Sequence, residues 1–291
     1  MMKRKLRIFL WCAAAVAFVL SGVLQAAEHL LPRQQLTDET AVHFIDVGQG
    51  DAALLLSGGQ AVLVDAGTAE SGPAIVRYLQ DLGVSRLHAA IVTHPHADHM
   101  GGMAQVLQMF PVEHFYMGSE TQNTSSFSDL LDALQTQGVQ PTVPTSGDML
   151  AFDSGASLTF LGPADDVPSD NLNDRSLITL FQADEQKVLL MGDAEAAAEQ
   201  SLLAHYPSLR CDALKVGHHG AATSSSQSFL QTVQPSVAVI SCGVDNDYGH
   251  PDPQTLQNLS LAGVTDIRIT AERGTVILPL HPPSSSKENA A

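Results

Sequence analysis

The sequence predicts an α/β domain with a full hydrophobic core. Two observations carry this prediction. In both halves of the chain, runs of strands give way to alternating strands and helices, and clusters of metal-binding side chains follow strands in both halves. The chain has 291 residues, of which 44% are hydrophobic, so it is long enough to bury one large core.

The N-terminal half begins with short β-branched and apolar runs and then alternates. Its expected strands are residues 42–47, 53–56, 61–64, 87–92 and 114–117, and its expected helices are 72–82, 100–109 and 128–137. Gly58 and Gly59 predict a hairpin turn between the second and third strands. Ile75, Val76 and Leu79 have helical spacing.

The C-terminal half follows the same plan. Its expected strands are 148–152, 157–161, 176–182 and 187–191, followed by a helix at 194–205, alternating strands and helices over 213–261, and closing strands at 267–270 and 275–280. The 194–205 segment is rich in Ala, Glu, Gln and Leu, which favour a helix. We see no short internal repeat and no second domain.

The N-terminus predicts export. Lys3, Arg4, Lys5 and Arg7 precede an apolar run over residues 8–24, the pattern of a signal peptide, so we assign residues 1–27 as a signal peptide or an uncleaved signal anchor. The protein is then extracellular, periplasmic or anchored to the cytoplasmic membrane, and this segment is its only expected membrane contact. Residues 28–39 form a linker, 40–281 the α/β domain and 282–291 a disordered tail.

The charge of the chain restricts its partners. The formal net charge is −17, and the first 27 residues hold four of the 14 basic residues but none of the 31 acidic ones. Such acidity keeps a protein soluble and repels polyanions. A basic stripe, which general nucleic-acid binding requires, is not evident. Cys211 and Cys242 are too few for a disulfide scaffold; buried free thiols are expected, with one bridge as the alternative.

The most informative segment is Thr93-His94-Pro95-His96-Ala97-Asp98-His99, which follows an expected strand. Imidazole and carboxylate are good ligands for divalent metals. In an extended turn, residues i and i+2 point the same way, so His94 and His96 can converge on one ion. Asp98 and His99 come after the chain bends and can face a second ion. Two such ions clamp the attacking and leaving oxygens of a hydrolysed ester.

This motif resembles that of the metallo-β-lactamase superfamily. Further blocks extend the resemblance: 61–67, ending in Asp65-Ala66-Gly67; 189–193, ending in Gly192-Asp193; and 214–220, containing His218-His219-Gly220. A narrower set is similar to the hydrolase domain of the competence protein ComEC and its free-standing relatives. It comprises 44–52, 173–177, the His-His-Gly and 248–251, and the match covers about 40–280. The resemblance implies an αββα sandwich, the metallo-β-lactamase fold, with two mixed sheets flanked by helices.

The resemblance also implies a ligand set. His94 and His96 would bind the first metal, Asp98 and His99 the second, and Asp193 would bridge them. An N-cap role is the other reading of Asp193. His218 and His219 compete for one place on the second metal, and we favour His219, with His218 lining the pocket.

Asn173 stands where the β-lactamases have a third histidine and would be a weak, neutral ligand of the first metal, which argues against β-lactam hydrolysis. A looser first site then allows Mn as well as the Zn that we favour.

The surrounding residues have less specific roles. His250 could contact a substrate phosphate or protonate a leaving group, or be a surface histidine. Asp65 is expected to orient a ligand histidine. Asp51 is as easily structural as functional, and Lys215 is interpreted as a strand lysine that extends to the surface.

The predicted function is that of an exported dinuclear metal-dependent hydrolase. Its substrate would be a phosphodiester, and the ComEC resemblance implies a nuclease acting on DNA. The acidity keeps a small phosphodiester, such as a phosphorylcholine ester, as an alternative. A lactonase, thioesterase or β-lactamase is the second enzyme class, and an extracellular metal-binding module without catalysis is the third.

Overall fold

The computed structural model describes residues 36–167 and 170–280. The expected signal segment, most of the linker and the expected tail lie outside this part. Within the described residues, no helix is both long and apolar enough to cross a membrane.

One mixed sheet belongs mainly to the N-terminal half. Its strands are β1 (Ala41–Phe44), β2 (Ala53–Ser57), β3 (Gln60–Val64), β4 (Leu87–Val92), β5 (Val112–Met117), β6 (Pro141–Thr142) and β14 (Val276–Pro279). The order is β14-β1-β2-β3-β4-β5-β6. Strands β3 to β6 are parallel, whereas β14, β1, β2 and β3 pair antiparallel. The last strand of the chain therefore completes the first sheet.

The second mixed sheet belongs to the C-terminal half. Its strands are β7 (Met149–Ala151), β8 (Ser157–Gly162), β9 (Ile178–Ala183), β10 (Gln186–Leu190), β11 (Ala213–Lys215), β12 (Val237–Ile240) and β13 (Asp266–Ile269), in the order β13-β12-β11-β10-β9-β8-β7. Strands β10 to β13 are parallel, and β7 to β10 antiparallel.

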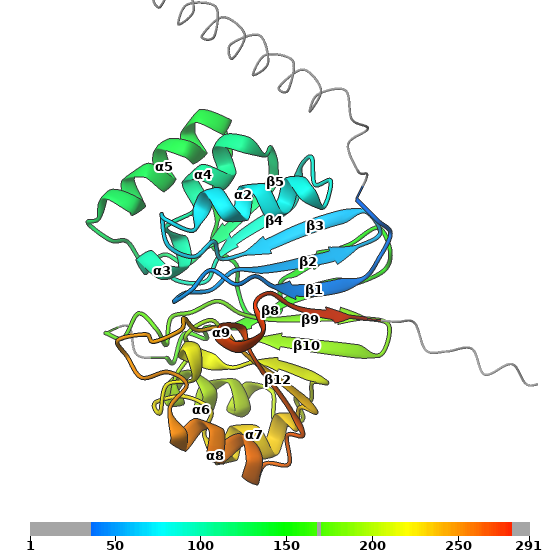
Figure 1. The fold of residues 1–291 in the computed structure, drawn as a ribbon, viewed down its shortest axis with the longest axis vertical. Coiled ribbons are helices and arrows are strands. Elements are labelled where there is room, and N and C mark those ends of the chain that lie inside the picture. Colours follow the sequence, from blue (N-terminus) through cyan, green and yellow to red (C-terminus); the bar gives the residue numbers. More distant parts are fainter. Residues whose placement is uncertain (1–35, 168–169, 281–291) are drawn as a thin grey trace, which may run out of the picture. The chain divides into compact units, whose positions relative to one another are not determined.

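Helices cover the outer faces of both sheets, as Figure 1 shows. The helices of the first half are α2 (Gly72–Asp81), α3 (Ala97–Met100), α4 (Met103–Met109) and α5 (Ser125–Gln137). Those of the second half are α6 (Ala196–His205), the short η1 (Gly217–Gly220), α7 (Gln227–Val233), α8 (Pro253–Leu261) and α9 (Thr270–Arg273). The outer faces are covered by α2, α4 and α5 on the first sheet and by α6 to α8 on the second. Three clusters of buried side chains lie between these layers: one under α2, α4 and α5, one between the sheets and one under α6 to α8. The predicted αββα sandwich is confirmed.

The sequence of a central strand shows why the first sheet is covered on both faces. In β3, Ala61 and Leu63 pack toward the helices, while Val62 and Val64 pack toward the second sheet. Side chains alternate between the faces of a strand, so a strand covered on both faces is apolar throughout.

The helix expected over residues 100–109 is two helices. α3 ends at Met100, α4 begins at Met103, and Gly101 and Gly102 lie between them. A Cβ added at Gly101 would lie 2.3 Å from the Ala97 carbonyl oxygen, and one at Gly102 2.3 Å from that of Ala66. Glycine at both positions leaves room for this close backbone packing, and Asp98 and His99 fall in the short first helix.

Candidate metal centre

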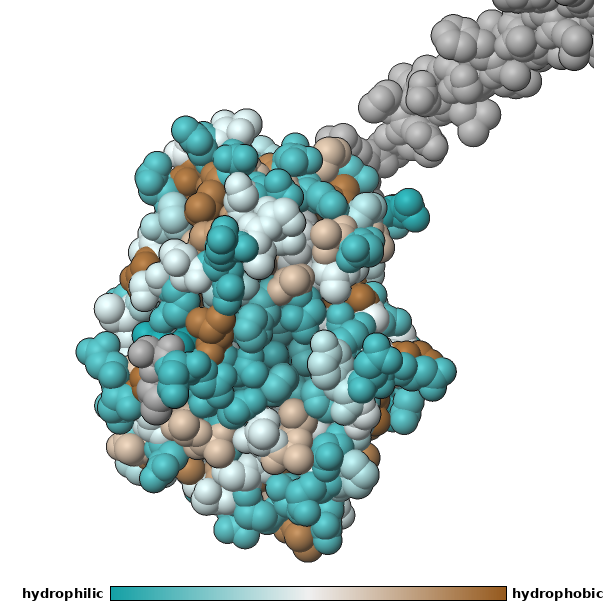
Figure 2. All heavy atoms as spheres, turned by 90° about the vertical axis from the view of Figure 1, so that its left-hand side faces the viewer, coloured by the Kyte–Doolittle hydropathy of each residue, from teal (hydrophilic) through white to brown (hydrophobic). Residues whose placement is uncertain are grey.

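The candidate site lies where parallel strands of both sheets end. The loop after β4 carries His94 to His99, the loop after β10 carries Asp193, and η1 after β11 carries His218 and His219. Carboxyl ends of parallel strands meet at one edge of a sheet, and two packed sheets bring two such edges together. Figure 2 shows this side of the molecule, where hydrophilic residues line the hollow in the middle of the surface.

Three of the expected ligands form a first donor cluster. Nε2 of His94 lies 2.9 Å from Nδ1 of His96 and 3.8 Å from Oδ2 of Asp193. Ligand atoms of the three residues lie within 4.8 Å of one another. His94 is buried, and the Ser176 hydroxyl lies 3.3 Å from its Nδ1. The Nε2 atom therefore faces the other two donors.

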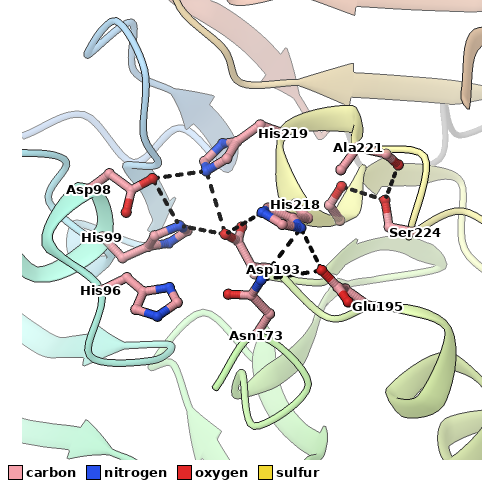
Figure 3. A network of polar contacts seen from close by, with 12 residues as sticks. His96, Asp98, His99, Asn173, Asp193, Glu195, His218, His219, Ala221 and Ser224 are labelled. Carbon is pink, nitrogen blue, oxygen red and sulfur yellow. Dashed lines mark hydrogen bonds and ion pairs between the residues drawn. The ribbon is translucent and has the colours of Figure 1, made fainter. Parts of the chain in front are cut away.

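Asp98, His99 and His219 form a second cluster beside the first. Nε2 of His219 is 3.2 Å from Oδ2 of Asp98, and Nε2 of His99 is 3.9 Å from the same oxygen. Oδ2 of Asp193 lies 3.1 Å from His99 Nε2 and 3.5 Å from His219 Nε2. Figure 3 shows the Asp193 carboxylate between His99 and His219 on one side and His218 on the other. One carboxylate thus faces both clusters.

Unpaired atoms test whether these residues suit a metal. Nε2 of His99, Nε2 of His219 and Oδ1 of Asp193 are buried and have no hydrogen-bond partner in the described part of the chain. Buried polar atoms nearly always have partners. These three unpaired atoms belong to the second cluster and to the carboxylate beside it, and all are of types that bind divalent ions, so they fit a cation.

The charges of these buried groups are strongly coupled. Burial alone would lower the pKa of His99, but the carboxylates of Asp193 and Asp65 outweigh it and raise this pKa well above its usual value. Burial opposes the charge of Asp193, yet His219, His99 and His94 hold its pKa well below the usual range. Burial lowers the pKa of His94, which keeps its imidazole neutral and able to coordinate.

Further contacts orient the histidines from behind. Oδ2 of Asp65 lies 2.8 Å from Nδ1 of His99, and Asp65 also accepts hydrogen bonds from the backbone and hydroxyl of Thr93. Nδ1 of His219 lies 2.9 Å from the Ser241 carbonyl oxygen. Each contact fixes a ring so that its Nε2 points into the site.

The two consecutive histidines of η1 point in different directions. Both have positive φ, 46° at His218 and 54° at His219. His219 joins the second cluster, whereas His218 lies on the other side of Asp193 with its Nε2 3.8 Å from Oδ2. The two rings therefore do not compete for one place.

Glu195 is a site residue that the sequence analysis missed. Its Oε1 lies 2.8 Å from Nδ1 of His218, and this hydrogen bond is the main reason why the pKa of Glu195 is lowered to about 2. The Asn173 amide nitrogen also donates to Glu195, while its Oδ1 is buried and has no hydrogen-bond partner within residues 36–167 and 170–280. The sequence does contain a signal for this role, because Glu195 is an acidic residue only two positions after Asp193.

The N-cap interpretation of Asp193 is wrong. The N-cap of α6 is Glu195, and Asp193 precedes it by two residues. The Asp193 backbone nitrogen donates to the Ser176 hydroxyl, and its side chain faces the clusters. The carboxylate is thereby left to the site.

A cavity of about 300 Å³ opens over both clusters. It is lined by Gln49, His96, Ala97, Asp98, Asn173, Asp193, His218, His219, Tyr248 and His250. His250 lies at its rim, with its ring centroid 5.6 Å from that of His218 and 6.3 Å from that of His219. Burial lowers the pKa of His250, and its Nδ1 has no hydrogen-bond partner among the described residues.

Relatives share this fold and much of this sequence. Residues 45–244 match the family described as the metallo-beta-lactamase superfamily. The chain is 29% identical to ComE operon protein 3 of Bacillus subtilis (strain 168), over 83% of this chain and 33% of that protein. It is 30% identical to Recombination protein 2 of Haemophilus influenzae, over 82% of this chain and 29% of that protein. The chain spans about a third of the length of these relatives.

Solved structures agree on the fold. The metallo-beta-lactamase fold protein YhfI from Bacillus subtilis superimposes with a TM-score of 0.55 and 14% identity, covering 83% of this chain and 100% of that one. CmlA, a diiron β-hydroxylase from Streptomyces venezuelae, gives 0.56 and 17%, covering 84% and 55%. The fold, the family match and the donor clusters lead to one conclusion. The chain belongs to the metallo-beta-lactamase superfamily, as a metal-dependent hydrolase related to competence proteins.

Proposed function

We propose that this protein is a phosphodiesterase that uses two divalent ions and acts outside the cytoplasmic membrane. The observation that carries the proposal is Asp193, whose carboxylate faces two donor clusters under one open cavity. Zn is the expected metal and Mn the alternative, because imidazole and carboxylate ligands accept both. The location rests on residues 1–27 alone, which lie outside the described residues.

The residues divide between the two ions. His94, His96 and Asp193 would hold the first, and Asp98, His99, His219 and Asp193 the second. When bound, such ions polarise a phosphoryl oxygen and make a water molecule acidic at neutral pH. The His218 ring, held by Glu195, lines the cavity over these ligands.

Two residues at the cavity have chemical roles of their own. The Asp98 side chain is 33% exposed and lines the cavity, so it can accept the proton of an attacking water. Because its pKa is lowered, His250 is neutral at pH 7. A neutral imidazole still donates one N–H hydrogen bond, and we assign it to a phosphate oxygen of the substrate.

An exposed aromatic ring at the cavity supports a nucleotide as the substrate. The Tyr248 side chain is 71% exposed, and its ring lies 5.6 Å from that of His250 at an interplanar angle of 23°. An exposed ring beside a phosphodiester site is a surface on which a base can stack. The ComEC resemblance supports a nuclease, and relatives named for recombination and competence agree with it.

The acidity of the chain favours a second candidate, a small phosphodiester. A net charge of −17 opposes the binding of a long polyanion. A short ester needs only the ions and the rim of the cavity. A phosphorylcholine ester remains in this class.

Turnover on two substrates tests the proposal. The protein without residues 1–27 is stripped by a chelator, reloaded with Zn or Mn, and assayed on bis(p-nitrophenyl) phosphate and single-stranded DNA. We expect cleavage restored by metal, and the ratio of the rates separates a nuclease from a small-ester enzyme. Metal binding without cleavage of either substrate would overturn the proposal and turn attention to carboxyl esters, thioesters and lactams.

A matched pair of variants tests the site. Removing a partner that merely orients a metal ligand costs about 10- to 100-fold in metal affinity or activity. D98A removes an expected ligand itself and should lower turnover by more than about 100-fold. D132A changes an exposed carboxylate of α5 and should retain turnover. Full activity in D98A would exclude the two-ion mechanism.

A further inference from the structure

Beneath the second donor cluster lies a buried ion pair that the mechanism does not use. Nζ of Lys215 contacts Oδ2 of Asp51, and the two residues are only 3% and 5% exposed. The sequence analysis interpreted Lys215 as extending to the surface, and this was wrong. Burying two charges costs free energy that their attraction alone often does not recover, so a buried pair is weak evidence for stability.

The pair joins the two halves of the sandwich. Asp51 follows β1 and precedes β2 in the first sheet, whereas Lys215 ends β11 in the second. Nζ of Lys215 also donates to the Gly192 carbonyl oxygen at 3.1 Å. Gly192 immediately precedes Asp193, so Lys215 is hydrogen-bonded to the backbone of the turn that carries the shared carboxylate.

Asp51 is tied in turn to the opposite group of ligands. Its backbone nitrogen donates to the Asp98 carbonyl oxygen at 3.0 Å, and its carbonyl oxygen accepts from Gly67 at 2.7 Å. Its carboxylate oxygens lie 3.7 Å from Nδ1 of His219 and 3.8 Å from Nδ1 of His99. One residue thus contacts the segment that carries Asp98 and His99.

The approach of these segments is close. A Cβ added at Gly50, next to Asp51, would lie 2.4 Å from the Asp98 carbonyl oxygen, and φ at Gly50 is +139°. A Cβ at Gly192 would lie 2.9 Å from Cβ of Ser176, with φ of +54°. Glycine at both positions lets the loops meet around the Lys215–Asp51 contact.

From these contacts we propose that Lys215 and Asp51 are positioning residues, which set the separation between the Asp98–His99 loop and the Asp193 turn and so complete the second metal position. The path runs from the Asp98 backbone to Asp51, from its carboxylate to Lys215, and from Lys215 to the Gly192 carbonyl. The proposal rests on the proposed two-ion centre.

The test measures metal binding directly. K215M, D51N and the double variant D51N/K215M are compared with the wild-type protein by metal content per chain and by competition with a chelator for Zn. The double variant keeps the shape of the pair without leaving one buried charge unpaired. E199Q is the control, because Glu199 is a carboxylate 1% exposed that accepts from the backbone of Ser225 and Ser226, outside the ligand loops.

We expect the charge-deleted variants to bind the second ion about 10- to 100-fold more weakly, with a smaller loss of affinity for the first ion, which shares the Asp193 carboxylate. E199Q should lose thermal stability but keep two ions. K215R, which keeps the charge, should recover part of the affinity.

Two outcomes would overturn the proposal. One is wild-type affinity for both ions in K215M and in the double variant. The other is failure of every variant without the Lys215 charge to fold, which would assign the pair to fold stability alone. A wild-type protein that binds fewer than two ions would instead contradict the proposed function.

Discussion

Asp65 holds His99 from a backbone conformation that few residues adopt. Its Oδ2 lies 2.8 Å from Nδ1 of His99, and its φ is 59°. Asparagine and aspartate tolerate this left-handed region better than other side chains with a Cβ. The residue type therefore meets a backbone requirement and a chemical requirement together.

This contact makes D65N a sharp variant. Asparagine keeps the backbone conformation but replaces the carboxylate that fixes the His99 ring. We expect metal affinity at the second position to fall about 10- to 100-fold. The metal-free protein should also lose thermal stability, because Asp65 is buried and its carboxylate pairs with His99. Chelator competition and thermal unfolding measure the two quantities. An unchanged affinity would show that Thr93 and packing alone orient the ring.

Glu195 gives the metal-free protein a defined pH dependence. Its pKa is lowered from 4.5 to about 2 in the folded state. A lowered carboxyl pKa contributes stability above the unfolded value, and that stability is lost as pH falls through the folded value. The contribution of Glu195 should therefore disappear between about pH 4.5 and pH 2.

Urea unfolding of the metal-free protein at pH 5 and pH 3 measures this effect. The midpoint should fall less between these pH values in E195Q than in the wild type, because glutamine does not titrate. An equal fall in both proteins would show that Glu195 is not perturbed by His218.

Tyr248 predicts a preference for substrates with a flat group. Base stacking on an aromatic side chain contributes about 1–3 kcal/mol. Y248A should therefore reduce the preference for thymidine 5′-p-nitrophenyl phosphate over ethyl p-nitrophenyl phosphate by about 5- to 150-fold in kcat/KM. Y248F keeps the ring and is the control. A preference that survives in Y248A would place the base elsewhere.

The two cysteines of the described domain should be unreactive while it is folded. Cys211 and Cys242 are free and buried, and burial raises the pKa of the Cys211 thiol to about 12. Thiolates are the reactive form. The chain has a third cysteine, Cys12, in its N-terminal segment, and a C12S variant removes it from the assay. In this variant, we expect Ellman's reagent to label Cys211 and Cys242 only after urea is added. Fast labelling under native conditions would show that the sheet around β11 and β12 opens.

The sequence predicted the fold well where its signals were periodic or compact. The expected helix 72–82 corresponds to α2 (Gly72–Asp81), and the expected strand 87–92 is β4. The His94-to-His99 motif marks one edge of the site because ligands so close in sequence cannot lie far apart. β6 and α9 were not expected, since segments of two and four residues carry no measurable period.

Contacts between distant segments could not be predicted from the sequence. Nothing local shows that Lys215 contacts Asp51, 164 residues away, and propensity places a lysine at the surface. The same holds for Glu195, whose role depends on where η1 turns the His218 ring. Such contacts depend on how the two sheets pack against each other. No local pattern in a single sequence indicates this packing.

The position of Asp193 between two donor groups has a thermodynamic consequence. A ligand common to two sites makes their occupancies interdependent, and the interaction free energy is the same in either direction. If binding of one ion changes the affinity for the other by a given factor, binding of the other ion changes the affinity for the first by the same factor. Metal content and chelator resistance are then properties of the pair of sites, and neither ion has an affinity that can be defined without stating whether the other is present.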